Sequence, residues 1–280
     1  MFYLLKSFIQ MKILLNKNDL NEALYSVSNL GFVPTMGSLH EGHMSLIKKS
    51  MKECKKTLVS IFINPTQFNN KIDFKNYPKS YKRDLSILKK LNVDFVFIPK
   101  NRDIYNYKRT KKIKLSKKDK IMCAKYRKGH FEGVIDVMDR LTKIIRPKKI
   151  FMGEKDFQQL YLVKNYIEKN YKSRIVPCKT IRDKNKLALS SRNILLNKNE
   201  LYIARQLSKT VYSIKKQLNK IDDKKKFLLK NKKEIKKIYN TSIEYLELRN
   251  INNLQMTNNI KKSKLFIAYY LNKIRLIDNF

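Results

Sequence analysis

Two of the three histidines in this sequence, His40 and His43, lie within four residues of each other. Residues 32–50 begin with an apolar pair, turn at Gly37, and continue from Gly42 with apolar residues at i, i+3 and i+4 spacing. This pattern predicts a short strand, a tight turn and a helix. Free N–H groups and the helix dipole make the start of a helix attractive to anions. Because imidazoles also donate hydrogen bonds to phosphate oxygens, the segment is a candidate phosphate site.

A second polar motif, Asn64-Pro65-Thr66-Gln67-Phe68, follows the most apolar predicted strand, 57–64. A side-chain amide both donates and accepts hydrogen bonds, so Asn64 and Gln67 suit a ligand that carries a hydroxyl and a carboxylate. The alternative is an ordinary loop with an asparagine cap.

The segment 153–159 (GEKDFQQ) repeats the layout of the histidine segment: a strand, a glycine, and polar groups at the start of a helix. Lys155 suits the neutralisation of phosphate charge, and Asp156 suits a ribose hydroxyl or a metal-bound water. Gln159 lies about one turn further on and faces the same side. A charged surface turn is the alternative.

Two further motifs are less specific. His130 opens a predicted amphipathic helix, 130–146, either as a ligand contact or as a structural hydrogen-bond partner. The run Ser190-Ser191-Arg192 offers two hydroxyls and a guanidinium in a row, which suits a polyphosphate.

The formal net charge is +40. Nucleic-acid or acidic-membrane binding would explain this charge, but the lysines are spread over many predicted helix faces, which favours compositional drift. We therefore expect no specific nucleic-acid partner. No segment approaches the roughly 18–20 apolar residues of a membrane helix, and three distant cysteines without a CxxC spacing favour a reduced, cytoplasmic setting.

The predicted elements alternate between strand and helix up to about residue 177. This alternation predicts an α/β fold, a doubly wound Rossmann-like parallel sheet in residues 1–177, followed by a smaller α+β C-terminal lid domain in 178–280. Residues 1–10 read as an extension before Met11. We expect Gly31 to stop a helix over 19–30 and Pro34 to end the strand at 32–33. Further strands are expected at 12–15, 57–64, 94–98, 149–152, 174–176, 245–249, 265–271 and 274–277, and further helices at 42–55, 78–91, 156–171, 199–218 and 222–239.

The strings VPTMG and SLHEGH within 33–43, together with NPTQF, GEKDFQQ and LSSRN (189–193), resemble the pantothenate synthetase (pantoate–β-alanine ligase) family within the HxGH nucleotidyltransferase superfamily. The resemblance spans residues 11–279. It implies ATP-dependent condensation of pantoate with β-alanine to pantothenate, through a pantoyl adenylate, with release of pyrophosphate and AMP. It also implies Mg²⁺, a cytoplasmic location and a homodimer.

The same resemblance implies a role for each matching residue. His40, His43 and Lys155 would be catalytic, with His43 as a proton donor. Gln67 would serve both pantoate and β-alanine, and Asp84 would hold a metal. Pantoate would contact Asn64, Gln67 and Gln159; ATP would contact Met36, Gly37, Ser38, Leu39, His40, Glu41, Gly42, His43, Gly153, Glu154, Lys155, Asp156, Ile181, Leu189, Ser190, Ser191 and Arg192.

Three other classes of protein explain less of the chain. A different nucleotidyltransferase would account for residues 40–43 but not for 64–67 or 153–159. An RNA-binding protein would account for the charge, but no aromatic and basic RNA motif is evident. A zinc enzyme would need a third ligand, and its helical histidines are usually four residues apart rather than three.

Overall fold

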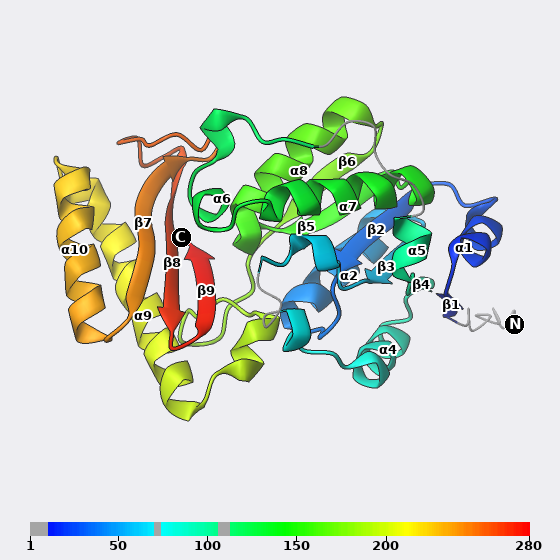
Figure 1. The fold of residues 1–280 in the computed structure, drawn as a ribbon, viewed down its shortest axis with the longest axis horizontal. Coiled ribbons are helices and arrows are strands. Elements are labelled where there is room, and N and C mark those ends of the chain that lie inside the picture. The colour runs from blue at the N-terminus through cyan, green and yellow to red at the C-terminus, as the bar shows by residue number, and fades with distance from the viewer. Residues whose placement is uncertain (1–10, 70–73, 106–112) are drawn as a thin grey trace, which may run out of the picture.

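The computed structural model describes residues 11–69, 74–105 and 113–280, and within them it contains two sheets (Figure 1). The proposed extension 1–10 lies outside the described residues, and so does part of 109–120, a segment that the sequence predicts to be a basic, irregular loop. The larger sheet has six parallel strands in the order β1-β4-β3-β2-β5-β6. Their bounds are Lys12–Leu14 (β1), Leu30–Thr35 (β2), Lys56–Ile61 (β3), Phe95–Phe97 (β4), Lys149–Gly153 (β5) and Arg174–Cys178 (β6).

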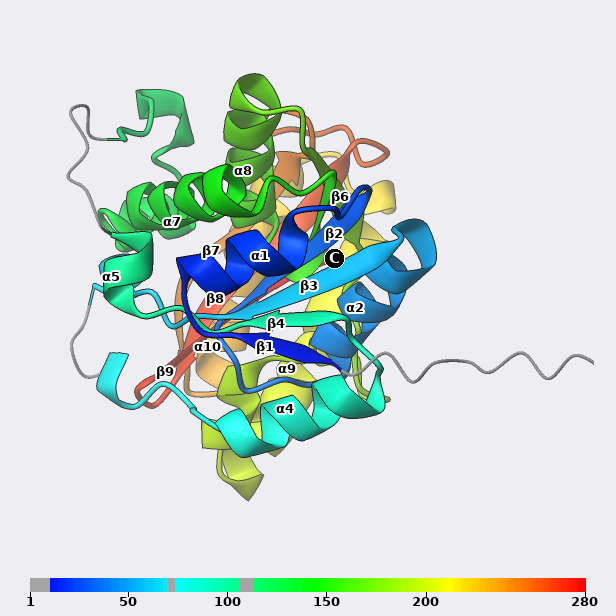
Figure 2. The same cartoon turned by 90° about the vertical axis from the view of Figure 1, so that its right-hand side faces the viewer.

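Helices cover both faces of this sheet, as Figure 2 shows. On β2, Phe32 packs with residues of α1 (Lys17–Leu24), α7 (His130–Ile145) and α8 (Phe157–Asn170). The next residue, Val33, packs with residues of α2 (Glu41–Glu53) and α4 (Tyr81–Lys90). Successive side chains of a strand point to opposite faces, so strands buried on both sides read as continuous apolar runs. The predicted doubly wound α/β fold is confirmed. The described part of this domain also contains the short helices α5 (Asn101–Ile104) and α6 (Cys123–Tyr126).

The strand order reverses between β2 and β5. From β2 the chain proceeds to β3 and β4 on one side, and later to β5 and β6 on the other. Ligands of open parallel sheets bind outside the carboxyl ends of the strands at such a reversal. The histidine segment follows β2 and the segment 153–159 follows β5, so the topology brings the two motifs together.

The prediction that Gly31 ends a helix over 19–30 is wrong. Helix α1 ends at Leu24 and is capped by the side chain of Asn16, and Gly31 lies within β2. A Cβ atom at Gly31 would collide with the hydroxyl of Ser50 in α2. The glycine therefore allows a helix to lie close to the sheet, which is a tertiary requirement that local sequence does not reveal.

The prediction that Pro34 ends its strand is also wrong, since β2 continues to Thr35 with Pro34 opposite Ser60 of β3. Proline cannot donate a hydrogen bond to a neighbouring strand. The pairing of β2 with β5 covers only Gly31 and Phe32, so Pro34 lies past the part of the strand that is paired on both sides.

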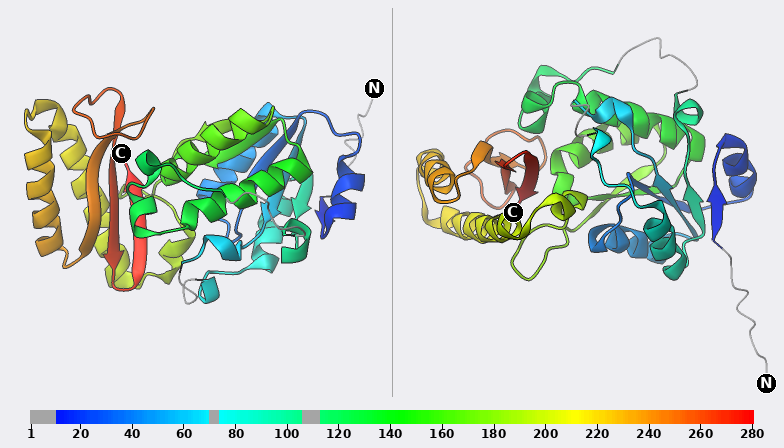
Figure 3. Two further views of the ribbon diagram at one scale, coloured as in Figure 1. Left: turned by 45° about the horizontal axis from the view of Figure 1, so that its top comes forward. Right: turned by 60° about the horizontal axis from the view of Figure 1, so that its bottom comes forward.

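The smaller sheet is antiparallel, with β8 (Ser263–Leu271) between β7 (Ser242–Asn250) and β9 (Ile274–Asn279). Helices α9 (Lys198–Gln217) and α10 (Lys224–Ile238) pack on one face. The other face turns toward the larger domain, and Figure 3 shows this sheet between the two helices and that domain. A second, α+β domain is thus confirmed, while its predicted start at 178 stays a prediction. Among the described helices, none has both the length and the apolar composition needed to cross a bilayer.

Candidate active site

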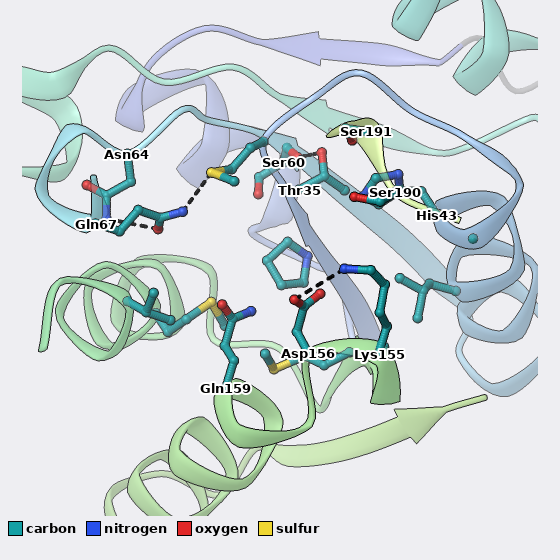
Figure 4. A pocket seen from close by; sticks show the side chains of 18 of the residues that line it. Thr35, His43, Ser60, Asn64, Gln67, Lys155, Asp156, Gln159, Ser190 and Ser191 are labelled. Carbon is teal, nitrogen blue, oxygen red and sulfur yellow. Dashed lines mark hydrogen bonds and ion pairs between the residues drawn. The ribbon is translucent and has the colours of Figure 1, made fainter. Parts of the chain in front are cut away.

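A cavity of about 240 Å³ lies at the strand-order reversal, between the carboxyl ends of β2 and β5. In Figure 4, Lys155, Asp156 and Gln159 rise from one side of it, and Asn64 and Gln67 lie across from them. Motifs far apart in the sequence therefore meet at one site. The predicted site residues that line it are Met36, His40, Gly42, His43, Asn64, Gln67, Gly153, Lys155, Asp156, Gln159, Ile181, Leu189, Ser190, Ser191 and Arg192.

The two histidines form the N-terminal cap of α2. Nδ1 of His40 accepts a hydrogen bond from the N–H of Gly42 at 3.1 Å, and Nδ1 of His43 accepts one from the N–H of His40 at 3.3 Å. The ring centroids are 4.1 Å apart. Because each Nδ1 acts as an acceptor, the neutral rings carry their proton on Nε2. The cap thus fixes two N–H donors at the start of a helix.

Both histidines are neutral at pH 7. Burial, helped by the ammonium of Lys155, lowers the pKa of His40 to about 4. Burial and the neighbouring His40 lower the pKa of His43 to about 3. In this state the two rings donate hydrogen bonds but carry no charge.

The buried carboxylate of Asp84, a residue that is 1% exposed, holds the turn that precedes the histidines. Its two carboxylate oxygens accept hydrogen bonds from the N–H groups of Ser38 and Leu39, each at 2.8 Å. Gly37 has φ +79°, and a Cβ there would lie 2.9 Å from the Asp84 carboxylate. Gly37, Ser38 and Leu39 therefore shape the site through their backbone and do not line the cavity.

Two predicted site residues have tasks other than those expected. Both oxygens of Asp84 are used to hold the turn, and the residue does not line the cavity, which argues against the predicted metal contact. Glu154 accepts a hydrogen bond from Lys264 at 2.9 Å and also lies outside the cavity lining, as does the exposed Glu41.

The turn after β5 supplies the opposite charges. Nζ of Lys155 lies 3.6 Å from Oδ1 of Asp156. Burial alone would raise the pKa of Asp156, but Lys155 and Arg192 outweigh it and lower the pKa. Asp156 is therefore ionised, and Lys155 stands at the start of α8 beside the cavity.

Asn64 lies at the cavity wall but is only 1% exposed. Its Oδ1 accepts a hydrogen bond from the hydroxyl of Tyr105 at 2.7 Å, and its Nδ2 donates to Oε1 of Gln67 and to the carbonyl of Gly133, each at 3.2 Å. A Cβ at Gly133 would collide with the carbonyl of Thr66, so α7 lies directly against this loop. Asn64 thus acts chiefly on the position of Gln67.

His130 also lines the cavity, yet both of its ring nitrogens have protein partners. Nδ1 lies 2.7 Å from the carbonyl of Gln67, and Nε2 lies 2.8 Å from a guanidinium nitrogen of Arg127. Burial, and then the charge of Arg127, lower its pKa to about 3. Of the two alternatives for His130, the structure supports the hydrogen-bond partner.

Residues 190–192, which we call the serine loop, join the two halves of the site. Oγ of Ser191 donates to the carbonyl of Ser38 at 3.1 Å, and the guanidinium of Arg192 lies 5.9 Å from the ring centroid of Tyr77. The segment that was predicted to bind a polyphosphate is therefore docked directly on the histidine turn.

An apolar wall was missed by the sequence analysis. It consists of Phe62 after β3 and of Val134, Val137, Met138 and Leu141 on α7. Periodicity identified α7 as amphipathic, but it does not say that part of the apolar face borders a cavity as well as the core. An apolar side chain carries no local signal of that difference.

Comparisons with known proteins identify the family of this chain. The model of a family described as pantoate–β-alanine ligase matches residues 11–280. A pantothenate synthetase from Sulfurihydrogenibium sp. is 35% identical and covers 96% of this chain and 99% of its own.

Two solved structures are similar along nearly the whole chain. The crystal structure of pantothenate synthetase from Thermus thermophilus has a TM-score of 0.90 and 27% identity, and covers 96% of this chain and 99% of its own. The ligase from Francisella tularensis, complexed with β-γ ATP and β-alanine, has a TM-score of 0.81 and 35% identity, with 96% and 97% covered. On these grounds, the chain belongs to the pantoate–β-alanine ligase family.

Proposed function

We propose that this chain joins pantoate to β-alanine in two steps that use ATP and form a pantoyl adenylate. The observation that carries the proposal is the cavity at the strand-order reversal, where phosphate-binding groups and a wall of amide side chains face one space. Family membership supplies the two substrates and the nucleotide.

In the first step a carboxylate oxygen of pantoate attacks the α-phosphorus of ATP. A phosphorus–oxygen bond forms, and the bond to the bridging oxygen of pyrophosphate breaks. Negative charge gathers around the phosphorus and on the leaving pyrophosphate, where preorganised donors lower the barrier. We assign this task to the Nε2–H groups of His40 and His43, to Lys155, and to the loop 190–192.

His43 would act here as a hydrogen-bond donor. With a pKa of about 3, the ring lacks the second, acidic proton of an imidazolium in the free enzyme, and pyrophosphate departs as an anion without needing one. A bound triphosphate would raise this pKa, because negative charge favours the imidazolium. The resemblance-based role of His43 as a proton donor is thus a prediction for the ATP complex.

Pantoate would lie between the amides and the apolar wall. Gln67 and Gln159 suit its hydroxyl and carboxylate, while Val134, Val137 and Met138 suit its hydrocarbon part. Asn64 would hold Gln67 through its Nδ2 contact. Gln67 would also help to place β-alanine.

In the second step the amine of β-alanine attacks the acyl carbon of the adenylate. A carbon–nitrogen bond forms, the bond from the acyl carbon to AMP breaks, and the amine releases a proton. No enzyme nucleophile is required. Cys54 and Cys178 are buried, and burial raises the pKa of both thiols, in the case of Cys178 to about 11.

Mg²⁺ would enter with ATP and neutralise phosphate charge during the first step. Among the described residues that line the cavity, Asp156 is the one acidic side chain, and its lowered pKa keeps it ionised. A hard cation prefers oxygen ligands and often keeps waters when bound by phosphates. Asp156 is thus the residue that fits this ion, directly or through a water.

We also propose that residues 1–177 bind ATP and pantoate and that residues 178–280 form a lid, since Ile181 and 189–192 reach the cavity from the second segment. A cytoplasmic homodimer without specific nucleic-acid binding remains the expectation from the family and the charge pattern. Sedimentation velocity and fluorescence anisotropy with RNA at several salt concentrations would measure these two properties.

Two assays test the proposed function. AMP should form only when ATP, pantoate and β-alanine are all present. Without β-alanine, labelled pyrophosphate should exchange into ATP only when pantoate is added, because the first step is then reversible. AMP formation in the absence of pantoate, or pyrophosphate exchange that requires β-alanine, would exclude the adenylate route.

A further inference from the structure

The last strand of the chain, β9, touches the turn that carries Lys155. Asn279 is 2% exposed. Its Nδ2 donates hydrogen bonds to the carbonyls of Glu154 at 2.8 Å and of Lys155 at 2.9 Å. The smaller domain therefore binds the backbone of a cavity residue directly.

Lys264 of β8 completes this contact. Its Nζ donates to Oδ1 of Asn279 at 3.0 Å and to Oε2 of Glu154 at 2.9 Å. The turn, a 3₁₀ segment over Glu154–Asp156, has no side-chain cap of its own. Its described anchors come from the opposite domain.

Asp278, the residue before Asn279, holds a second segment that leads to the site. The carboxylate of Asp278 receives both terminal nitrogens of Arg182, at 2.7 and 2.8 Å, and Arg182 also donates to the carbonyl of Asn279. Arg182 forms a β-bridge with Ala188, which begins the approach to the serine loop. Two adjacent residues of β9 thus hold both the Lys155 turn and the base of the serine loop.

The chemistry of the contact requires an amide. Two carbonyl acceptors need two N–H donors on one nitrogen, and Lys264 needs an oxygen acceptor beside it. Among side chains of this length, asparagine alone offers both, since aspartate cannot donate in its ionised form. The side-chain amide of Asn279 therefore matches all three of its partners, and we call this set of hydrogen bonds the clamp.

We propose that Asn279 is a positioning residue for Lys155 in the adenylation step, an inference that rests on the proposed function. The backbone sets the direction in which the Lys155 side chain leaves Cα, and this direction limits the positions that the ammonium can reach. Two hydrogen bonds to consecutive carbonyls fix the peptide planes on either side of Cα of Lys155. Loss of the clamp leaves the ammonium present but misplaced relative to the phosphates.

The first test compares Asn279→Ala and Asn279→Asp with the wild type in pantoate-dependent pyrophosphate exchange. Both variants lose the two donors, and we expect kcat to fall by about 10²-fold, the scale of a misplacement near 1 Å. The KM for pantoate should stay within about threefold, since Gln67 and its partners are untouched. Asn250→Ala, in β7 of the same sheet, is the matched control and should keep the wild-type kcat.

The second test is a double-mutant cycle with Lys155→Met. If Asn279 acts through Lys155, then Asn279→Ala should change kcat little once the ammonium is gone. An equal loss in both backgrounds would overturn the proposal and leave a merely structural contact. Thermal unfolding of each variant shows whether it is folded.

ATP–Mg²⁺ titration calorimetry separates this proposal from the proposed function. Asn279→Ala should weaken ATP binding in the wild-type background and not in the Lys155→Met background. Wild-type enzyme without pantoate-dependent exchange would refute the adenylation chemistry, while the calorimetric cycle would still decide whether Asn279 acts through Lys155. Equal ATP affinity of wild type and Asn279→Ala would overturn the clamp.

Discussion

The two turns that face each other across the cavity share a layout but differ in what holds them. The histidine turn after β2 is fixed chiefly within its own domain, by the Asp84 carboxylate and by the reciprocal cap of His40 and His43, and it receives one further hydrogen bond from Ser191. The turn after β5 is fixed by Asn279 and Lys264 of the other domain.

This difference separates two kinds of preorganisation. The N–H donors of the histidine turn need only the larger domain, so they are in place whenever that domain is folded. The ammonium of Lys155 depends on the contact with β9. Phosphate binding at the first turn therefore should not depend on the domain contact, whereas charge neutralisation by the second should.

The largest effect is expected at the first turn. His43→Ala should lower kcat by about 10²–10⁴, the scale of lost acid or oxyanion assistance. His43→Asn keeps a side-chain oxygen that can accept from the N–H of His40 but lacks the Nε2–H donor. Its kcat should fall as far as that of His43→Ala, but its melting temperature should fall less. Wild-type kcat in either variant would remove His43 from the chemistry.

The next prediction concerns Asp84, which holds the backbone of the same turn. Asp84→Asn replaces one acceptor oxygen by a donor, so one buried N–H of Ser38 or Leu39 loses its partner. We expect unfolding free energy to fall by about 2–3 kcal/mol and kcat by about 10-fold or more. Asp223→Asn, at the exposed cap of α10, is the control and should cost almost nothing, because asparagine caps helices as well as aspartate. Equal denaturant midpoints for the two variants would contradict the anchor role of Asp84.

A third variant tests whether pantoate is recognised outside the two turns, by Gln67 in the loop after β3. Gln67→Ala should weaken the binding of pantoate by about 10-fold, which corresponds to the loss of a hydrogen bond to a charged group. It should leave the affinity for ATP nearly unchanged. Titration calorimetry with each ligand measures both. A larger loss of affinity for ATP than for pantoate would mean that Gln67 contacts the nucleotide and not pantoate.

The smallest effect is the acid sensitivity of the histidine turn. The pKa values of His40 and His43 are lowered in the folded protein, so the unfolded chain binds protons more readily below pH 6.5. Stability is therefore complete above about pH 6.5 and falls as the pH drops toward 4 and then 3. Between pH 6.5 and 5.5 the loss should be at most about 1 kcal/mol per histidine, since both rings are partly exposed.

Chemical denaturation at several pH values, in wild type and His43→Asn, measures this slope. The variant should show a shallower slope in that window, where carboxylates do not yet titrate. Identical slopes would mean that His43 keeps its ordinary pKa.

The sequence predicted which motifs lie together better than it predicted some element ends. The motifs at 40–43, 64–67, 153–159 and 190–192 were each found from residue types at a chain turn, and all reach the cavity. The errors at Gly31 and Pro34 arose because both residues are local breakers whose actual place depends on neighbouring elements. The exclusion of Asp84 from the cavity has the same origin, since a carboxylate looks alike in sequence whether it binds a metal or two backbone amides.

What the sequence determined by itself is the alternation of strand and helix, the polar groups at the strand ends, and the family. These are local properties, because periodicity and turn chemistry act over a few residues. Only the tertiary structure decided that Asn64 contacts Gly133 and that His130 contacts Gln67, that α7 provides an apolar wall, and that Asn279 reaches Lys155. Such contacts join residues more than sixty or a hundred positions apart, and they depend on packing between elements, which no single stretch of sequence contains.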